Sequence, residues 1–467
     1  MRHKVTLGSV HKGSEAFIIA EHFVNKEKSI LYIARDDREI YALQSKLFWL
    51  LPKADILIFR SWDQIPYDNV SPSREIQSER IKSLYQLSVN KQKKIILSSV
   101  NAIIQRTVDQ SFIKKNYVTI FVNQKLNFNH FIQQLISLGY QRTSVVREKT
   151  DFAIRGSIVD IFIVDRKNPL RIDFFDNNIE SIYEFDRLTQ KRLLKIENEK
   201  IYIHPSSELL INDETITLFR KNFREIFSNY RLSQVYNSFS ESILPPGGEQ
   251  FLPFFLEKME TFFNFVNDCQ VIVNSQFNDL LENRIENIND FFKARKQLND
   301  NFYLKPDQLY LSSNETNHYL SKSDLIKFSE FTDEKSKKAN IKKIPNLSSI
   351  RKEIDFDFID KFFNIHSKLK TIIICCRSLG SLDRVHKIIY ENLNISLNHI
   401  KNFQEIKENI NFYITTLEID DAFELGKLIF LNEKSLFGYN FATKEKRIKN
   451  TNIFFEEINK LTKESVL

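Results

Sequence analysis

The chain has 467 residues, enough for about three domains that each bury a core. Its formal net charge of +7 and pI near 8.9 are compatible with nucleic-acid binding but do not indicate it. No signal peptide opens the chain and no apolar run reaches the roughly 20 residues of a membrane helix, so we expect a cytoplasmic protein with no membrane contact. Cys269, Cys375 and Cys376 lack metal-type or disulfide-type spacing, and we expect reduced thiols.

Short apolar strands and helical stretches alternate in the first part of the chain. This alternation is typical of a parallel α/β sheet. A serine followed by proline, Ser71-Pro72, offers an N-cap for the third helix. We expect strands at 28–34, 56–59 and 94–98 and helices at 14–23, 37–51 and 74–87.

Gly8 and Gly13 have the spacing of a phosphate-binding P-loop, and a helical stretch follows them. The lysine of such a loop reaches the phosphates and its hydroxyl residue holds magnesium. In this chain Ser14 occupies the lysine position and Glu15 the hydroxyl position. A carboxylate there repels phosphate, so the sequence predicts a degenerate P-loop and no nucleoside triphosphate hydrolysis.

A helix is predicted at 127–138, with Gly139 at its C-terminal stop position. An antiparallel run follows over residues 151–186. Together these segments predict a small α+β unit that ends near Pro205.

Within this run, the stretch LRIDFF alternates between apolar and polar residues. A strand would place Ile172 and Phe174 on one face and Arg171, Asp173 and Phe175 on the other. A DNN turn and a returning strand come next. An aromatic ring between charges is a residue mix that carries much of the binding energy at protein interfaces. The same pattern also fits an ordinary hairpin with one exposed phenylalanine.

Residues 206–330 are richer in helix and have an aromatic centre at 251–265. The lysine-dense stretch 332–343 is the best candidate for a solvated linker, and a binding patch is the alternative. A further compact α/β unit is expected after it, with helices at 354–368 and 381–393 and strands at 371–376, 411–416 and 427–432.

The sequence indicates no catalytic residue and no metal ligand. It contains no nucleophile elbow, no HExxH and no CxxC motif. The adjacent carboxylates Asp420 and Asp421 follow a short strand and fit a solvated turn. Recognition of a partner is therefore the expected chemistry.

Four blocks of sequence, spread over almost the whole chain, resemble the bacterial transcription-repair coupling factors, the Mfd family. They occur in the order and at the intervals of that family. The blocks are SWDQIPYDNVSPSREIQSERIKSLYQL, RGSIVDIF with LRIDFFDNNIES, LPPGGEQFLPFF, and LNEKSLFG.

The resemblance implies the N-terminal part of that family. Its fold would be a degenerate, P-loop helicase-like parallel sheet with an inserted small α+β domain, followed by a further compact α/β domain. The chain stops where the polymerase-binding domain would begin, so we expect it to lack the ATP-driven motor. The implied domains are 1–124 (UvrB-like 1a), 125–205 (UvrA-docking), 206–331 (UvrB-like 1b), 332–350 (linker) and 351–467 (third domain and C-terminal helix).

The family's contact residues for the excision-repair protein UvrA correspond to Arg155, Arg171 and Phe175. The resemblance therefore implies UvrA as the partner, with RNA polymerase and DNA engaged only indirectly, through other domains or a second chain. Arg155 has a structural alternative, because it could tie down the preceding loop.

The resulting hypothesis is a non-catalytic adaptor that recruits UvrA in transcription-coupled nucleotide excision repair. It needs no cofactor, since ATP in this family serves domains that we expect to be absent here. The alternatives are a DNA-binding helicase-like remnant, which would bind DNA with strong salt dependence, and a truncated product without independent function.

Overall fold

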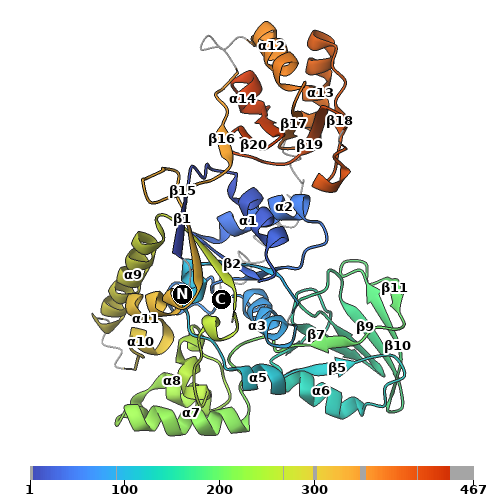
Figure 1. Cartoon of the computed structure of the whole chain (residues 1–467). Coiled ribbons are helices and arrows are strands. Elements are labelled where there is room, and N and C mark those ends of the chain that lie inside the picture. Colours follow the sequence, from blue (N-terminus) through green and yellow to red (C-terminus); the bar gives the residue numbers. More distant parts are fainter. Residues whose placement is uncertain are drawn as a thin grey trace, which may run out of the picture. The chain divides into compact units, whose positions relative to one another are not determined.

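The computed structural model describes residues 4–90, 92–266, 268–297, 302–347, 354–407 and 409–441 (Figure 1). The chain divides into two compact units. Unit 1 comprises residues 1–10 and 15–339, and unit 2 comprises residues 11–14 and 340–467. Among the described residues, no helix combines the length and the apolar character of a membrane-spanning segment.

Unit 1 is built on a seven-stranded sheet in which all neighbouring strands are parallel. The predicted parallel α/β architecture is thus confirmed. The spatial order is β15-β1-β14-β13-β2-β4-β3. The strands are β1 (Lys4–Gly8), β2 (Ile30–Ala34), β3 (Ile56–Phe59), β4 (Ile95–Ser99), β13 (Gln270–Asn274), β14 (Asp324–Phe328) and β15 (Lys337–Lys338).

Four of these strands, β1, β13, β14 and β15, were missing from the sequence-based interpretation. β13 and β14 lie in the middle of the sheet, between β1 and β2, although their residues come from the part of the chain expected to be helical. Their apolar runs are short, and a short apolar run does not distinguish a buried strand from a buried helix. The first and third segments of unit 1 therefore share one sheet.

Helices cover the sheet on both faces. Leu31, Ile33 and Ile96 belong to the core that also contains α3, α4 and the aromatic segment described below. On α2, buried apolar residues pack toward β2 and β4. The helices are α1 (Glu15–Asn25), α2 (Asp37–Leu50), α3 (Arg74–Val89), α4 (Val100–Ile104) and α5 (Gln110–Lys115).

The N-cap predicted for α3 is wrong by two residues. Ser73, not Ser71, caps the helix, and its Oγ accepts a hydrogen bond from the backbone nitrogen of Ile76 at 3.4 Å. The Oγ of Ser71 instead accepts the backbone N–H of Gly247 at 3.1 Å. Ser71 therefore makes a tertiary hydrogen bond and does not cap the helix.

A second sheet of six strands forms the small α+β unit, in the order β11-β10-β9-β8-β7-β6. Its pairs are antiparallel except β6 with β7. We call it the docking sheet. The strands are β6 (Gln141–Arg142), β7 (Asp151–Arg155), β8 (Ile158–Ile161), β9 (Leu170–Phe175), β10 (Asn178–Phe185) and β11 (Arg192–Ile196).

One face of the docking sheet packs on helix α6 (Phe128–Ser137) and on the antiparallel pair β5 (Val118–Ile120) and β12 (Ile201–Ile203). Ile172 and Phe174 of β9 belong to this core. Gly139 follows α6 with φ +82°, the left-handed conformation expected of a C-terminal stop. The predicted helix and its stop are confirmed.

The remainder of unit 1 is rich in helix and aromatic side chains, as predicted. Phe219 stacks on Phe255 with ring centroids 4.7 Å apart, and Phe59 of β3 stacks on Phe262 at 4.3 Å. The elements are α7 (Asp213–Ile226), η1 (Tyr230–Leu232), α8 (Gln234–Ser240), η2 (Gly248–Phe255), η3 (Phe262–Asn264), α9 (Phe277–Gln297), α10 (Pro306–Leu309) and α11 (Ser313–Ser321).

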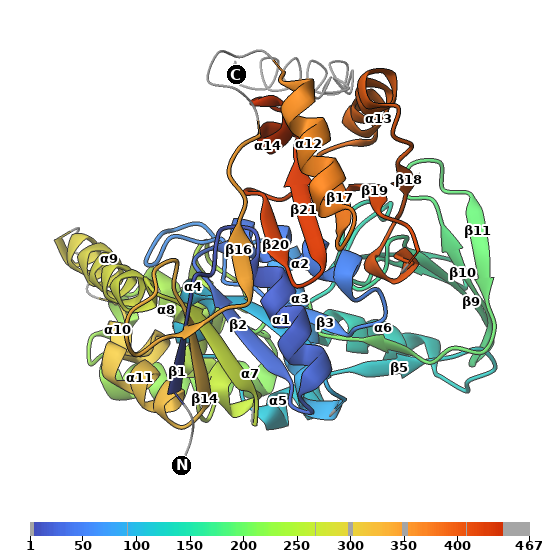
Figure 2. The ribbon, with the colours of Figure 1, turned by 45° about the horizontal axis from the view of Figure 1, so that its top comes forward.

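Unit 2 is an α/β domain with a six-stranded sheet in the order β16-β20-β21-β17-β19-β18. Figure 2 shows α12 and α13 beside these strands. The strands are β16 (Ile341–Lys343), β17 (Thr371–Cys376), β18 (Asn398–His399), β19 (Phe412–Thr416), β20 (Phe423–Leu425) and β21 (Leu428–Asn432). The helices are α12 (Phe356–His366), α13 (Leu379–Leu393), η4 (Phe403–Glu405) and α14 (Glu433–Phe437).

Three further expectations concern particular segments. The two units divide between Ala339 and Asn340, inside the stretch expected to be a linker. The expected C-terminal helix falls within residues 442–467, outside the described part of the chain. Cys269, Cys375 and Cys376 are buried, and none of the three is part of a disulfide bond.

Candidate partner-docking surface

The β9–β10 hairpin confirms the alternation read from the sequence. Along β9 the buried residues are Leu170, Ile172 and Phe174, and the residues between them face the other way. Asp176 makes the turn with φ +55°, a conformation that aspartate tolerates better than most residues. The hairpin therefore has one core face and one outer face, and the outer face is the candidate surface.

Phe175 lies on this outer face at the last position of β9, with a side chain that is 73% exposed. A fully apolar ring held this far into solvent contributes little to folding. A single exposed apolar residue is common on protein surfaces. Phe175 belongs to a hydrogen-bonded strand, so its backbone is held in place. A rigid backbone of this kind suits a residue that contacts a partner.

Arg155 lies at the end of β7, with an exposed side chain. In the part of the chain that the structure describes, its guanidinium makes no hydrogen bond or ion pair, so no contact supports the alternative in which it ties down a loop. Gly156 follows with φ +63°, and an added Cβ there would meet nothing within 4 Å. The turn beside Arg155 is therefore open to solvent.

Arg171 has very different surroundings. Its Nε and Nη2 donate to the two carboxylate oxygens of Asp160 at 2.8 and 2.9 Å, and its Nη1 donates to the carbonyl oxygen of Gln190 at 3.3 Å. The guanidinium carbon lies 4.7 Å from the ring centroid of Phe185. Only 13% of the Arg171 side chain is exposed, and Asp160 is fully buried.

The hydrogen bonds that Arg171 donates to the Asp160 carboxylate raise the pKa of Arg171 above its usual value. A bidentate ion pair with a buried carboxylate serves to stabilise the fold. Breaking the pair would leave the buried carboxylate charge uncompensated. Sequence analysis missed Asp160. The signal was present, since alternation in IVDIF places Asp160 on the outer face between Val159 and Ile161.

Strand pairing fixes how these residues are arranged. Arg155 pairs with Ile158, and Ile158 pairs with Asp173 of β9. Phe175 is two residues beyond Asp173 and therefore on the same face. Arg155 and Phe175 thus share one open face. Arg171 lies on the same face, two residues before Asp173 on β9, and is covered by its ion pair with Asp160.

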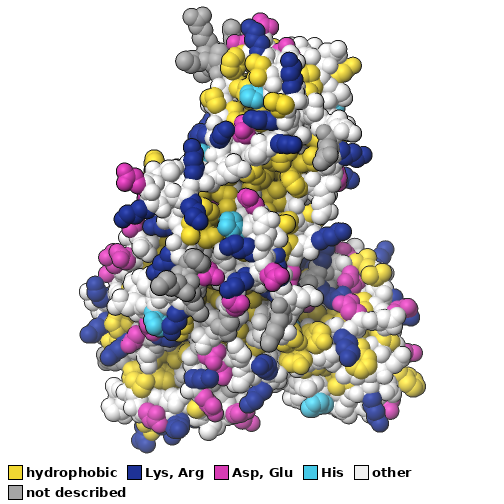
Figure 3. Space-filling model, viewed as in Figure 1, with side chains coloured by type: hydrophobic (Ala, Val, Ile, Leu, Met, Phe, Trp, Pro, Cys, Tyr) yellow, Lys and Arg dark blue, Asp and Glu magenta, His cyan; other side chains and the backbone are white. Residues whose placement is uncertain are grey.

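Figure 3 shows hydrophobic and charged side chains interspersed over the lobe that carries the docking sheet. The mixture is typical of interfaces that form and dissociate, where apolar anchors are surrounded by polar groups.

The four P-loop positions lie in a strand–loop–helix sequence. Gly8 ends β1, Gly13 has φ +92°, and Glu15 begins α1. Ser14 is fully buried, and its Oγ donates to the carbonyl oxygen of His11 at 2.6 Å. The position that a P-loop lysine would occupy is therefore taken by a small side chain bonded within the loop.

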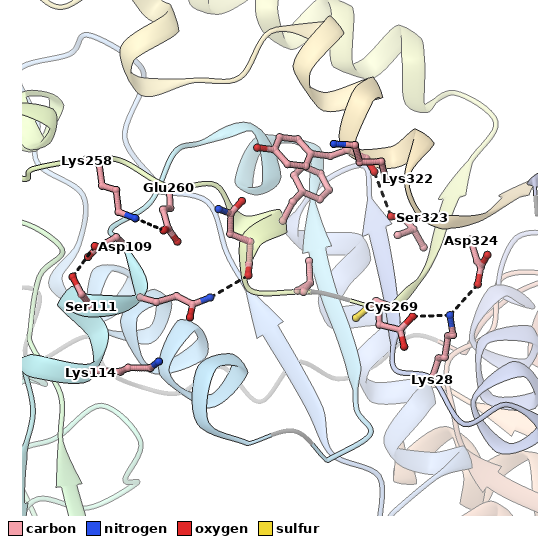
Figure 4. Close-up of a pocket in the computed structure, with 17 residues that line it drawn as sticks. Lys28, Asp109, Ser111, Lys114, Lys258, Glu260, Cys269, Lys322, Ser323 and Asp324 are labelled. Carbon is pink, nitrogen blue, oxygen red and sulfur yellow. Dashed lines mark hydrogen bonds and ion pairs between the residues drawn. The ribbon is translucent and has the colours of Figure 1, made fainter. Parts of the chain in front are cut away.

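A separate cavity of about 1010 Å³ lies in unit 1, where β2, β13 and β14 begin (Figure 4). Lys28 bridges Asp268 and Asp324 at 2.6 and 3.3 Å, and Lys258 pairs with Glu260 at 3.0 Å. Both lysines are therefore paired with carboxylates of the cavity wall.

The cavity also contains the thiol of Cys269. Burial raises the pKa of this thiol to about 12, so it is not a thiolate near neutral pH. No group of histidines, cysteines and carboxylates among the described residues could hold a metal ion. The cavity therefore offers no arrangement of nucleophile, base or ligand that would make it the preferred site.

Comparison with known proteins points to the same region of the chain. Residues 118–209 match the model of the UvrB interaction domain family. The match begins with β5 and ends just after β12, so it encloses the docking sheet and its core helix.

Several curated proteins are similar over longer stretches, and all three of the following are transcription-repair-coupling factors. The protein of Rickettsia bellii is 29% identical over 95% of this chain and 40% of its own length. That of Haemophilus influenzae is 30% identical over 70% of this chain and 28% of its own length. That of Escherichia coli is 29% identical over 58% of this chain and 23% of its own length.

The chain is related to the N-terminal part of the transcription-repair coupling factors. It spans about two fifths of the length of the Rickettsia relative and less of the other two. The alignment with the Rickettsia bellii protein runs through both compact units, so the similarity is not confined to the docking sheet.

Proposed function

We propose that this chain binds the excision-repair protein UvrA through the outer face of the docking sheet, and that it does so as part of a transcription-repair coupling factor. RNA polymerase and DNA would belong to this role through other parts of such a factor. The observation that carries the proposal is the pairing of an exposed Phe175 and an exposed Arg155 on one face of a domain that matches the UvrB interaction domain model.

The chemistry of this face suits a protein partner. Phe175 would fill an apolar pocket, and Arg155 would pair with carboxylate or carbonyl groups beside it. Arg171, which the resemblance also implies as a contact, would act mainly by holding β8 and β9 in register through Asp160.

Binding of purified UvrA to the whole chain tests the proposal. Phe175→Ala should weaken binding by about 2 kcal/mol, which corresponds to about a 30-fold rise in Kd. Arg155→Ala should weaken it by a similar factor. Calorimetric titration of the wild type and both variants at low and moderate salt provides the measurement.

Phe331→Ala is the matched control, because Phe331 is 83% exposed and lies outside the docking sheet. Its Kd should equal that of the wild type. Wild-type binding weaker than tens of micromolar, or equal losses for the Phe175 and Phe331 variants, would contradict the proposal.

We also propose that this part of the chain acts as an adaptor without nucleotide hydrolysis of its own. The proposal is supported by Ser14 and Glu15 at the positions that would contact phosphate and magnesium. Phosphate release from MgATP by the purified chain should not exceed the uncatalysed rate. Saturable hydrolysis that Glu15→Ala alters would contradict it, since a contaminating ATPase would not respond to that substitution.

A further inference from the structure

Arg192 stands at the start of β11, the edge strand of the docking sheet, and was not a candidate from the sequence. Its Nη2 donates to Oδ2 of Asp173 at 2.8 Å, and its guanidinium carbon lies 4.3 Å from the ring centroid of Tyr183. The side chain thus reaches from β11 across β10 to β9, and 46% of it remains exposed.

The position of Asp173 locates this guanidinium on the candidate surface. Asp173 is two residues before Phe175 on the same face of β9, and its neighbour Ile158 on β8 pairs in turn with Arg155. Arg155, Ile158 and Asp173 lie side by side on β7, β8 and β9, and Arg192 reaches Asp173 from the other edge of the sheet. Phe175 is the next residue of β9 that faces outward.

Arg171 and Arg192 differ in what they leave available to a partner. Arg171 directs three nitrogens to Asp160 and Gln190 and is mostly covered. A guanidinium has five N–H donors in a planar fork. Arg192 donates to Asp173 through one nitrogen, Nη2, while nearly half of its side chain faces solvent.

We propose that Arg192 is a contact residue of the docking surface and supplies, with Arg155, the positive charge around Phe175. This inference rests on the proposed function. The partner surface should carry carboxylates on both sides of an apolar pocket. Because Asp173 and Tyr183 already hold the guanidinium, binding loses less side-chain entropy than it would with an unrestrained arginine.

The experiment measures the Kd for UvrA of the wild type, Arg192→Ala, Phe175→Ala and Arg142→Ala, from low to moderate salt. Arg142 is the matched control, because it is an exposed arginine on β6, at the opposite edge of the same sheet. Arg192→Ala should raise Kd at least tenfold and reduce its dependence on salt, whereas Arg142→Ala should leave both unchanged.

Thermal unfolding of each variant separates contact from folding. Arg192→Ala should change Tm only slightly, since 46% of the Arg192 side chain is exposed and Asp173 keeps the hydrogen bond from the Ser181 hydroxyl at 2.8 Å. Arg171→Ala should lower Tm, because it leaves the buried carboxylate of Asp160 without its ion-pair partner. Arg192→Lys, which keeps the charge, should restore part of the lost affinity.

The possible outcomes separate the two proposals. If Phe175→Ala weakens binding and Arg192→Ala changes Kd less than twofold, the role of Arg192 is overturned while the docking function stands. If Arg192→Ala and Arg142→Ala weaken binding equally, only net charge matters and the role of Arg192 is also overturned. If the wild type does not bind, both proposals are overturned together.

Discussion

Two arginines of the docking sheet show how surroundings, rather than residue type, decide what a side chain can do. Arg171 lies over Phe185 and holds the buried Asp160. Arg192 lies over Tyr183 and holds Asp173, but remains half exposed. Period-two alternation predicted that Arg171 faces outward, and it does. The alternation could not predict that Asp160 of the neighbouring strand would cover Arg171. The sequence of one strand does not determine which residues of the next strand lie opposite it.

His204 provides a residue-scale prediction about pH. Its ring is 9% exposed and lies 4.4 Å from that of Tyr85. Burial lowers the pKa of His204 to about 4, with nearby Lys82 acting in the same direction and Asp165 against it. An unfolded histidine titrates near 6.5. Folding therefore favours the neutral ring, and the stabilisation is present above pH 6.5 and is lost as the pH falls toward 4.

Between pH 7 and pH 4.5 this group alone should lower the free energy of unfolding by about 2 kcal/mol. His204→Phe removes the titration, so the wild type should lose more stability over this interval than the variant does. Denaturant unfolding of both proteins at the two pH values provides the comparison. Equal losses would show that His204 is not held neutral by the fold.

At the scale of elements, helix α3 and the segment after β12 are joined by a buried ion pair. Arg80 of α3 and Glu208 are both fully buried, with Nε and Oε2 3.0 Å apart. Trp62 donates its indole N–H to the same carboxylate at 2.6 Å. The pair holds the segment after β12 against helix α3.

Glu208→Ala should therefore destabilise unit 1 strongly, by about 3–5 kcal/mol, because it leaves Arg80 charged, buried and uncompensated. Both tryptophans of the chain, Trp49 and Trp62, belong to unit 1, so tryptophan fluorescence during denaturant unfolding reports on this unit.

Glu75→Ala is the control for this substitution. Glu75 pairs with Lys149 at 3.2 Å, but its side chain is 53% exposed, and such pairs contribute little. Its loss should stay within about 0.5 kcal/mol. Similar losses for the two variants would contradict the structural role assigned to Glu208.

Local elements were predictable where the signal is local. The strand Thr371–Cys376 was predicted with the correct bounds, and helix α6 was placed to within one residue at each end. Gly139 closed α6 as expected because glycine adopts the left-handed conformation of a helix stop more readily than other residues. In contrast, the hydrogen bond that Ser71 accepts from the backbone of Gly247 joins distant parts of the chain, and no local pattern reveals it.

At the scale of the molecule, the class of fold was predictable but the assembly of the main sheet was not. The alternation of helix and strand indicated a parallel sheet, and three of its strands were located. The strands β13 and β14 were not predicted, because the helices and aromatic segments around them dominate the local sequence pattern. Their place between β1 and β2 follows from packing over long sequence distances, which a single sequence does not display.

The insertion of the docking domain into this sheet has a consequence for synthesis of the protein. Val118 and Ile203 pair with one another, so the domain begins and ends at one place and can close on itself. Its residues leave the ribosome before β13 and β14 exist, and these strands complete the middle of the supporting sheet. The candidate surface is therefore able to form on the nascent chain once residue 203 has left the ribosome, before β13 and β14 are available to complete the main sheet.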